Sequence, residues 1–328
     1  MTSPVRIVVH AAAERWRVLA RCGEQLHLGL VKSNVRAALA VLLVLNLMWG
    51  SSLPATKLGL VEWSPFVLSW LRLTVSSALF LGVLLLGKEL QSLRPRDWLS
   101  LIGLGVIGYG GTIGLQTLGT SGTSGASAAV LGSTGPLFIT LSAWVLLRER
   151  IARRTVVGLP VALLGVALVM GMSPAGDPAS GLALLSSQHL VGDLLVLASA
   201  ACFGVFAVLG KNTMERCSPL AVSGISCLGG ALVLAPSAFW ELAASPLQPT
   251  WLGWSVVAHL GVVVTFVGML AWFWALRIVP ASRGGAFLFL QPLSGIALAA
   301  LLLGDALSLS FLVGSVFVLA GLFIAAGE

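Results

Sequence analysis

The chain has 328 residues, of which 57% are hydrophobic and only 9% are charged, and its net charge is +7. A typical soluble domain carries about 25% charged residues, so this composition excludes an ordinary water-soluble protein. It also excludes an intrinsically disordered chain, because disorder needs low hydrophobicity and high charge. The basic residues stand between apolar runs as an orientation signal, so no nucleic-acid partner is predicted. The composition predicts a polytopic membrane protein.

Ten apolar segments follow an amino-terminal tail of residues 1–35. Each has close to the roughly 20 mostly apolar residues that a spanning helix needs. A polar linker at 173–190, which contains glycine, proline and serine, separates the fifth segment from the sixth. In chain order the predicted spans are 37–56, 65–86, 98–118, 126–147, 156–172, 192–210, 220–240, 251–276, 285–303 and 309–326.

The basic residues alternate with these spans. With the tail in the cytoplasm, all of the 19 basic residues except Lys57 and Arg72 lie in the tail or in cytoplasmic loops. Lys57 falls on the outer side, and Arg72 lies inside the second span. Cytoplasmic loops of membrane proteins carry an excess of lysine and arginine. This bias therefore favours ten spans with both termini in the cytoplasm.

The two halves of the chain resemble each other. An offset of 156 residues pairs Pro136 with Pro292, and an offset of 154 pairs Gly50 with Gly204. Each half holds five spans, and an odd number places the second half upside down in the bilayer. Inverted halves that exchange conformations open a midplane site to either side in turn. Further matched pairs are Glu149 with Asp305, Gly158 with Gly314, Gly165 with Gly321, and Lys57 with Lys211.

An ordered set of short motifs resembles the drug/metabolite transporter superfamily of EamA type, over about residues 39–327. The family implies ten-helix secondary transporters, often exporters of amino acids, metabolites or drugs, with a cavity built from spans one, three, four, six, eight and nine. One departure is an aspartate, at position 305, where the second half more often has glutamate. The motifs are Trp49-Gly50-Ser51-Ser52, Arg72, Thr120-Ser121, Ala126-Ser127-Ala128-Ala129, Gly135-Pro136, Leu147-Arg148-Glu149-Arg150, Pro292 and Gly304-Asp305.

Two titratable side chains inside spans are candidate site residues. Arg72 is the only basic residue within a span, and because a charge in lipid is costly it is expected to face the bundle or a watery cavity. There it could hold a substrate carboxylate, or it could snorkel to the outer surface or bond neighbouring carbonyls. His259 is the only histidine within a span, and it could relay a proton or be a neutral packing residue.

Uncharged residues complete the candidate set. The amides of Asn46, Gln116 and Gln291 suit either a polar cavity or hydrogen bonds between helices. The aromatic rings of Trp49, Tyr109 and Trp272 could line the cavity or anchor the helices at the interface. Pro136 and Pro292 stand at matched positions and are expected to act as hinges or as simple kinks.

An enzyme is the alternative from a different class. Gly119-Thr120-Ser121-Gly122 and Gly122-Thr123-Ser124-Gly125 match the GxSG pattern of rhomboid-type intramembrane serine proteases. Ser121 or Ser124 would then act with His259 as a nucleophile–base pair. Glycine and serine are abundant in this chain, so short matches to this pattern are expected by chance. Ten spans and the repeat favour a transporter, and a membrane receptor or scaffold without transport is a third option.

The sequence thus predicts an all-α membrane protein of ten transmembrane helices in two inverted five-helix repeats, at 36–172 and 191–328. We expect a secondary transporter, not an enzyme, that exports a small metabolite, amino acid or drug by alternating access. No cofactor or metal is expected. Its partners are a small-molecule substrate and the lipid bilayer of the cell inner (plasma) membrane. The sequence is also compatible with a homodimer.

Overall fold

The computed structural model describes residues 35–326 apart from 88–89, 91–92, 149–152, 172–186, 215, 245–246, 277, 280–286, 306 and 308. Residues 1–34 and nearly all of the predicted linker lie outside these ranges. The described residues form helices and no strands. Seven helical segments are long and apolar enough to cross a membrane: Val35–Gly59, Pro65–Leu86, Pro95–Gly122, Gly125–Leu147, His189–Gly210, Pro219–Ala244 and Trp251–Trp272.

Three shorter apolar helices, Val156–Val166, Leu290–Leu303 and Phe311–Ile324, accompany these seven. A first helix covers residues 35–50. The elements that follow it are α2 (Ser52–Gly59), α3 (Pro65–Leu86), α4 (Pro95–Gly105), η2 (Val106–Gly111), α5 (Thr112–Gly122), α6 (Gly125–Gly132), α7 (Gly135–Leu147), α8 (Arg153–Gly171), α9 (Ser187–Met214), α10 (Pro219–Ala244), α11 (Trp251–Ala258), η4 (His259–Val267), α12 (Gly268–Leu276), η5 (Phe287–Phe289), α14 (Leu290–Leu303) and α15 (Leu309–Ala326).

Irregular backbone recurs at matched places in the two halves. The π-helical segments η2 and η4 interrupt the third and the eighth predicted spans. Positive φ angles occur in the described chain at Arg148 (54°) and Gly304 (70°), which are 156 residues apart and follow α7 and α14 directly. Pro136 lies at the start of α7, where proline's missing N–H costs no helical hydrogen bond, and Pro292 is the third residue of α14, which directly follows the 3-10 segment η5. Their predicted hinge role stays a prediction.

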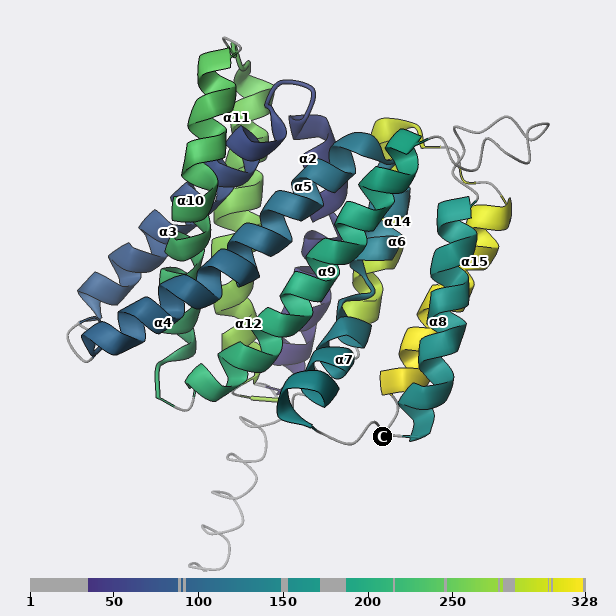
Figure 1. The fold of residues 1–328 in the computed structure, drawn as a ribbon, viewed down its shortest axis with the longest axis horizontal. Helices are drawn as coiled ribbons and strands as arrows, with labels where there is room; N and C mark the ends of the chain where they lie inside the picture. Colours follow the sequence, from purple (N-terminus) through teal and green to yellow (C-terminus); the bar gives the residue numbers. More distant parts are fainter. Residues whose placement is uncertain are drawn as a thin grey trace, which may run out of the picture.

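Two pairs of helices that the sequence offset matches pack against each other in opposite directions. Figure 1 shows α8 beside α15, and α3 beside α10. Near the end of α10, Glu241 Oε2 accepts hydrogen bonds from Phe66 N (3.0 Å) and Val67 N (3.1 Å) at the start of α3. A carboxylate there satisfies N–H groups that the helix leaves unpaired. The start of one helix therefore meets the end of its equivalent.

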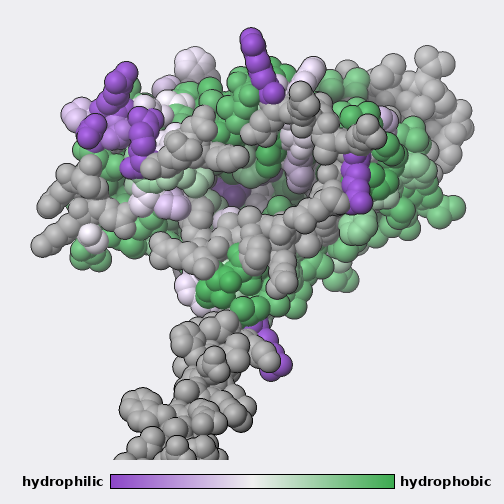
Figure 2. All heavy atoms as spheres, turned by 90° about the horizontal axis from the view of Figure 1, so that it is seen from below, coloured by the Kyte–Doolittle hydropathy of each residue, from purple (hydrophilic) through white to green (hydrophobic). Residues whose placement is uncertain are grey.

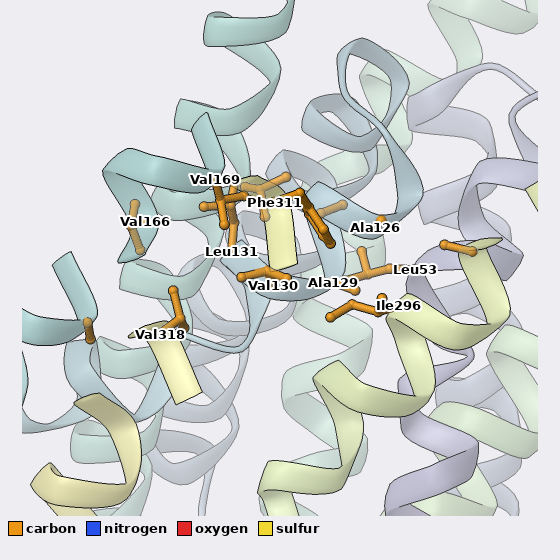
Figure 3. Close-up of a cluster of buried hydrophobic side chains, with 14 of the residues drawn as sticks. Leu53, Ala126, Ala129, Val130, Leu131, Val166, Val169, Ile296, Phe311 and Val318 are labelled. Atoms are coloured by element: carbon orange, nitrogen blue, oxygen red, sulfur yellow. The ribbon is translucent and has the colours of Figure 1, made fainter. Parts of the chain in front are cut away.

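Glycines bring α8 and α15 into backbone contact. A Cβ atom on Gly165 would lie 2.7 Å from Gly314 O, and one on Gly321 would lie 2.6 Å from Gly158 O. Both contacts are the same under the 156-residue offset, with the helices exchanged. Small residues allow such close approach of helices in membranes. Figure 3 shows part of the apolar cluster that joins this helix pair to α6 and α14, including Val166, Val318 and Leu131.

The upper end of Figure 1 holds capped helix starts. Glu62, between α2 and α3, accepts hydrogen bonds from Thr250 N (2.7 Å), Thr250 Oγ1 (2.7 Å) and Gly253 N (3.1 Å). These bonds fix the start of α11, where a negative charge is favourable. The hydrogen bond from the Thr250 side chain holds the pKa of Glu62 below its ordinary value, although partial desolvation opposes it.

A pH-dependent contribution to stability follows from Glu62. Since its pKa is lower in the folded protein, the stabilisation is present above the ordinary glutamate pKa of about 4.3 and is lost as the pH falls through the lowered value. We expect the stability of Glu62→Gln to fall less steeply than that of the parent as the pH is lowered. Thermal unfolding of both proteins in detergent across the acidic range measures the difference. Parallel curves would show that the charge does not matter.

Candidate functional site

Arg72 lies in the middle of α3, and its side chain is buried with 6% exposure. Its Nε donates a hydrogen bond to Thr265 Oγ1 (3.0 Å), and a guanidinium Nη donates to Ser52 Oγ (3.4 Å). Both acceptors are neutral, and no carboxylate among the described residues interacts with the guanidinium. A buried cation without a counter-ion is costly unless an anion joins it. The site is therefore suited to a negatively charged group.

The π-helical segment η4 places the partner of Arg72. Thr265 Oγ1 donates to Leu260 O (2.8 Å), five residues earlier, as the wider π turn allows. Trp49 Nε1 in the first helix donates to Val264 O (2.8 Å) in the same segment. The third and the eighth predicted spans thus both carry π segments, and η4 holds the first helix and α3 together.

The predicted amides and tryptophans gather around the first helix. Gln291 Nε2 on α14 donates to Asn46 Oδ1 (2.9 Å), while Asn46 Nδ2 donates to Leu42 O (2.7 Å). The rings of Trp49 and Trp272 stand 5.6 Å apart, tilted by 42°. These residues come from the first helix, α12 and α14, so side chains from both halves of the sequence meet here.

Tyr109 and Gln116 come from the other side of the predicted cavity. Tyr109 in η2 packs edge-on against Phe206 of α9 (centroids 5.4 Å apart) and shares a side-chain hydrogen bond with Ser223. It also interacts electrostatically with Arg72. Gln116 on α5 is half-buried and faces Gly132 of α6. The structure therefore brings Tyr109 near Arg72, whereas it gives Gln116 no hydrogen bond from its side chain within the described residues.

His259 opens η4 and pairs with Ser51, whose Oγ lies 2.8 Å from Nε2. Since Ser51 Oγ donates its hydrogen to Met48 O (2.6 Å), the ring nitrogen that faces it is the donor. Ser121 Oγ donates to Leu118 O (2.6 Å), and Ser124 Oγ caps α6 by accepting from Ser127 N (3.0 Å). Neither serine is paired with His259, so the protease alternative is not supported.

The face seen from below in Figure 1 is hollowed. Figure 2 shows this face, with a recess near its middle and hydrophilic surface at its floor. At the opposite end, Lys57 Nζ donates to Thr120 O (2.9 Å), Ser121 O (3.2 Å) and Thr123 O (2.7 Å), and so ties α2 to the turn between α5 and α6. One end of the bundle is thus recessed and the other is tied.

The EamA-like transporter family matches the chain twice, at residues 36–171 and 190–327. These matches cover most of the chain. The chain belongs to the EamA-like transporter family. It is therefore an integral membrane protein and a transporter, not an enzyme, as the sequence predicted.

The relatives of this EamA-like chain carry transporter names. It is 27% identical to an "Uncharacterized transporter" of Archaeoglobus fulgidus, over 84% of this chain and 94% of the relative. It is also 27% identical to a "Probable terminal-alkyne amino-acid exporter" of Streptantibioticus cattleyicolor, over 84% and 89% of the two chains. One solved structure, at 20% identity, matches it with a TM-score of 0.61 over 88% of this chain and 96% of the other, which indicates a shared fold.

Two functional candidates of this EamA-like site were not singled out from the sequence. Thr265 and Ser52 hold the Arg72 guanidinium. Threonine and serine inside an apolar run give no periodic signal, because either can bond its own helix. Ser52 stands in the Trp49-Gly50-Ser51-Ser52 motif, so that resemblance was its one signal.

Proposed function

We propose that this EamA-like chain is a ten-helix exporter built from two inverted five-helix repeats, residues 36–172 and 191–328, which moves a small carboxylate-bearing metabolite by alternating access. The exchanged contacts carry this proposal. Gly165 approaches Gly314 O as Gly321 approaches Gly158 O, and the start of α3 meets the end of α10. An approximate twofold axis in the membrane plane relates the two halves if each equivalent pair is antiparallel, and this is the symmetry of inverted repeats.

The same exchange reaches the helices near the site. A Cβ on Gly50 would collide with Ser294 on α14, and a Cβ on Gly204 would collide with the backbone of Phe138 on α7. Gly50 and Gly204 are 154 residues apart, and Phe138 and Ser294 are 156 apart. The first helix therefore packs on α14 as α9 packs on α7. Rocking that exchanges these two contacts would open the bundle alternately at its two ends.

Charge supports the orientation. Arg94 and Arg96 at the start of α4 and Arg148 after α7 lie at the recessed end, where lysine and arginine mark the cytoplasmic side. The recess then opens to the cytoplasm, and Lys57 ties the outer end. Both termini are cytoplasmic, in the inner (plasma) membrane. A substrate would enter this state from the cytoplasm, as an exporter requires.

The Arg72 site supports the substrate class. A carboxylate could accept from the guanidinium beside the neutral hydroxyls of Thr265 and Ser52, and a charge-assisted pair of this kind is stronger than a neutral hydrogen bond. Trp49 and Trp272 offer apolar ring surface near the amides of Asn46 and Gln291. The amino-acid exporter among the relatives agrees with such a substrate.

A flux screen tests the proposed transport. The purified protein is reconstituted in liposomes that are loaded with amino acids and small carboxylic acids. Efflux of each compound is then followed with and without a pH gradient. We expect efflux of at least one carboxylate-bearing compound and none from empty liposomes. Absence of flux for every compound in folded protein would favour the receptor or scaffold. Labelling of the loops at 88–94 and 148–154 from opposite sides would contradict the ten-span topology.

A further inference from the structure

A buried acid lies at the tied end of the bundle, away from Arg72. Asp193, near the start of α9, is 1% exposed. Its Oδ1 accepts a hydrogen bond from Thr123 Oγ1 (2.6 Å), but its Oδ2 is buried without a partner among the described residues. His189 Nδ1, one helical turn earlier, is also buried without a partner. Side chains four residues apart share one face of a helix, so the two atoms without partners lie on the same side of α9.

The charged groups around Asp193 are engaged elsewhere. Lys57 Nζ donates to three backbone carbonyls of the turn that carries Thr123. Asp305 Oδ2 accepts from Ala126 N (2.8 Å) at the start of α6. Helices α5, α6 and α7, which pack on α9, carry no Asp, Glu, His, Lys, Arg, Cys or Tyr. The remaining titratable groups on elements that contact α9 are Arg96, Asp97, Tyr109, Cys227 and Glu241, on α4, η2 and α10.

An ionised carboxylate in this position would leave one buried oxygen without a hydrogen bond from the described residues. Burial of an unpaired charge is far more costly than burial of a neutral hydrogen-bonded group. A proton on Oδ2 removes the charge and turns this oxygen into a hydrogen-bond donor. We infer that Asp193 is a proton-binding site that holds the outer end closed when it is occupied.

The hydrogen bond from Thr123 couples the protonation of Asp193 to the opening of the outer end. It joins α9, in the second half of the chain, to the α5–α6 turn of the first half, which Lys57 also holds from α2. When the outer end opens, water reaches Asp193 and the acid releases its proton to the outside. The inference rests on the proposed alternating access. It adds that external protons favour the state recessed toward the cytoplasm.

Cysteine labelling of the full chain in proteoliposomes tests this inference without knowledge of the substrate. The four native cysteines are replaced by alanine, and Thr120→Cys reports opening, because Thr120 is fully buried beside the Lys57 contact. A membrane-impermeant maleimide is added outside. We expect labelling to slow severalfold as the external pH falls from about 8 to about 5.5, within the limit of about tenfold per pH unit that one proton sets.

Asp193→Asn, which imitates the protonated acid, should label slowly at both pH values, and Asp193→Glu should keep the response. The thiol's own ionisation is cancelled by comparison with Asp193→Asn in the same reporter background. Glu62→Gln is the control at the same end, because Glu62 caps α11 and not the α5–α6 turn, and it should respond like the parent. The inference is overturned if Asp193→Asn keeps the response or if Glu62→Gln abolishes it. Loss of both labelling and flux at every pH would instead contradict alternating access.

Discussion

Replacing Arg72 by alanine is expected to abolish carboxylate efflux while the protein still inserts in the membrane. The guanidinium is the one charge that the described site offers, and its hydrogen-bond partners, Thr265 and Ser52, are neutral. Hydrogen bonds to a charged group contribute about 1.5–3 kcal/mol each. If the guanidinium donates two of them to the substrate carboxylate, their loss is expected to weaken substrate binding by at least about a hundredfold. Efflux from proteoliposomes measures transport, and elution as a single folded species in detergent shows that the variant still folds.

Conservative variants separate binding from structure. Arg72→Lys keeps the charge but loses the planar fork that can bond Thr265 and a carboxylate together, so it should retain partial efflux. Thr265→Val removes one neutral partner and should lower efflux less than Arg72→Ala does. Normal efflux in the folded Arg72→Ala protein would refute the proposed role. It would leave Arg72 as a residue that only bonds neighbouring helices.

The sequence located Arg72 but could not say what surrounds it. A lone arginine in an apolar run stands out because a charge inside the bilayer is energetically costly, and no tertiary structure is needed to recognise it. Its partner Thr265 approaches only because η4 widens into a π turn. No hydropathy pattern announces such a turn, because it adds one residue to a helix without any change in composition. The residue was therefore predictable, whereas its coordination was not.

The segments show the same division. Pro65–Leu86 and Leu309–Ala326 have the bounds predicted for them, and a proline begins the first of these helices. The helix predicted at 126–147 instead breaks between Gly132 and Gly135, ahead of Pro136. The burial of Asp193 depends on packing against the α5–α6 turn, which lies 70 residues away in the chain and so leaves no signal in the sequence around Asp193.

Adding a methyl group at Gly165 or Gly321 is expected to destabilise the protein. Each Cβ would meet backbone atoms of the partner helix, at 2.7 Å from Gly314 O and 2.6 Å from Gly158 O. Backbone cannot move aside as a flexible side chain does, and overpacking of this kind costs about 1–3 kcal/mol. Gly165→Ala and Gly321→Ala should therefore both lower the melting temperature in detergent, by similar amounts because the two contacts are equivalent.

Gly82→Ala and Gly103→Ala are the matched controls, because nothing lies within 4 Å of a Cβ at either position. In a helix, alanine is favoured over glycine by about 1 kcal/mol, so these variants should be neutral or stabilising. The same chemical change thus has opposite signs according to whether a helix stands opposite. If Gly165→Ala and Gly321→Ala behaved like the controls, α8 and α15 would not be in contact. The exchanged contacts on which the inverted repeat rests would then lose their strongest pair.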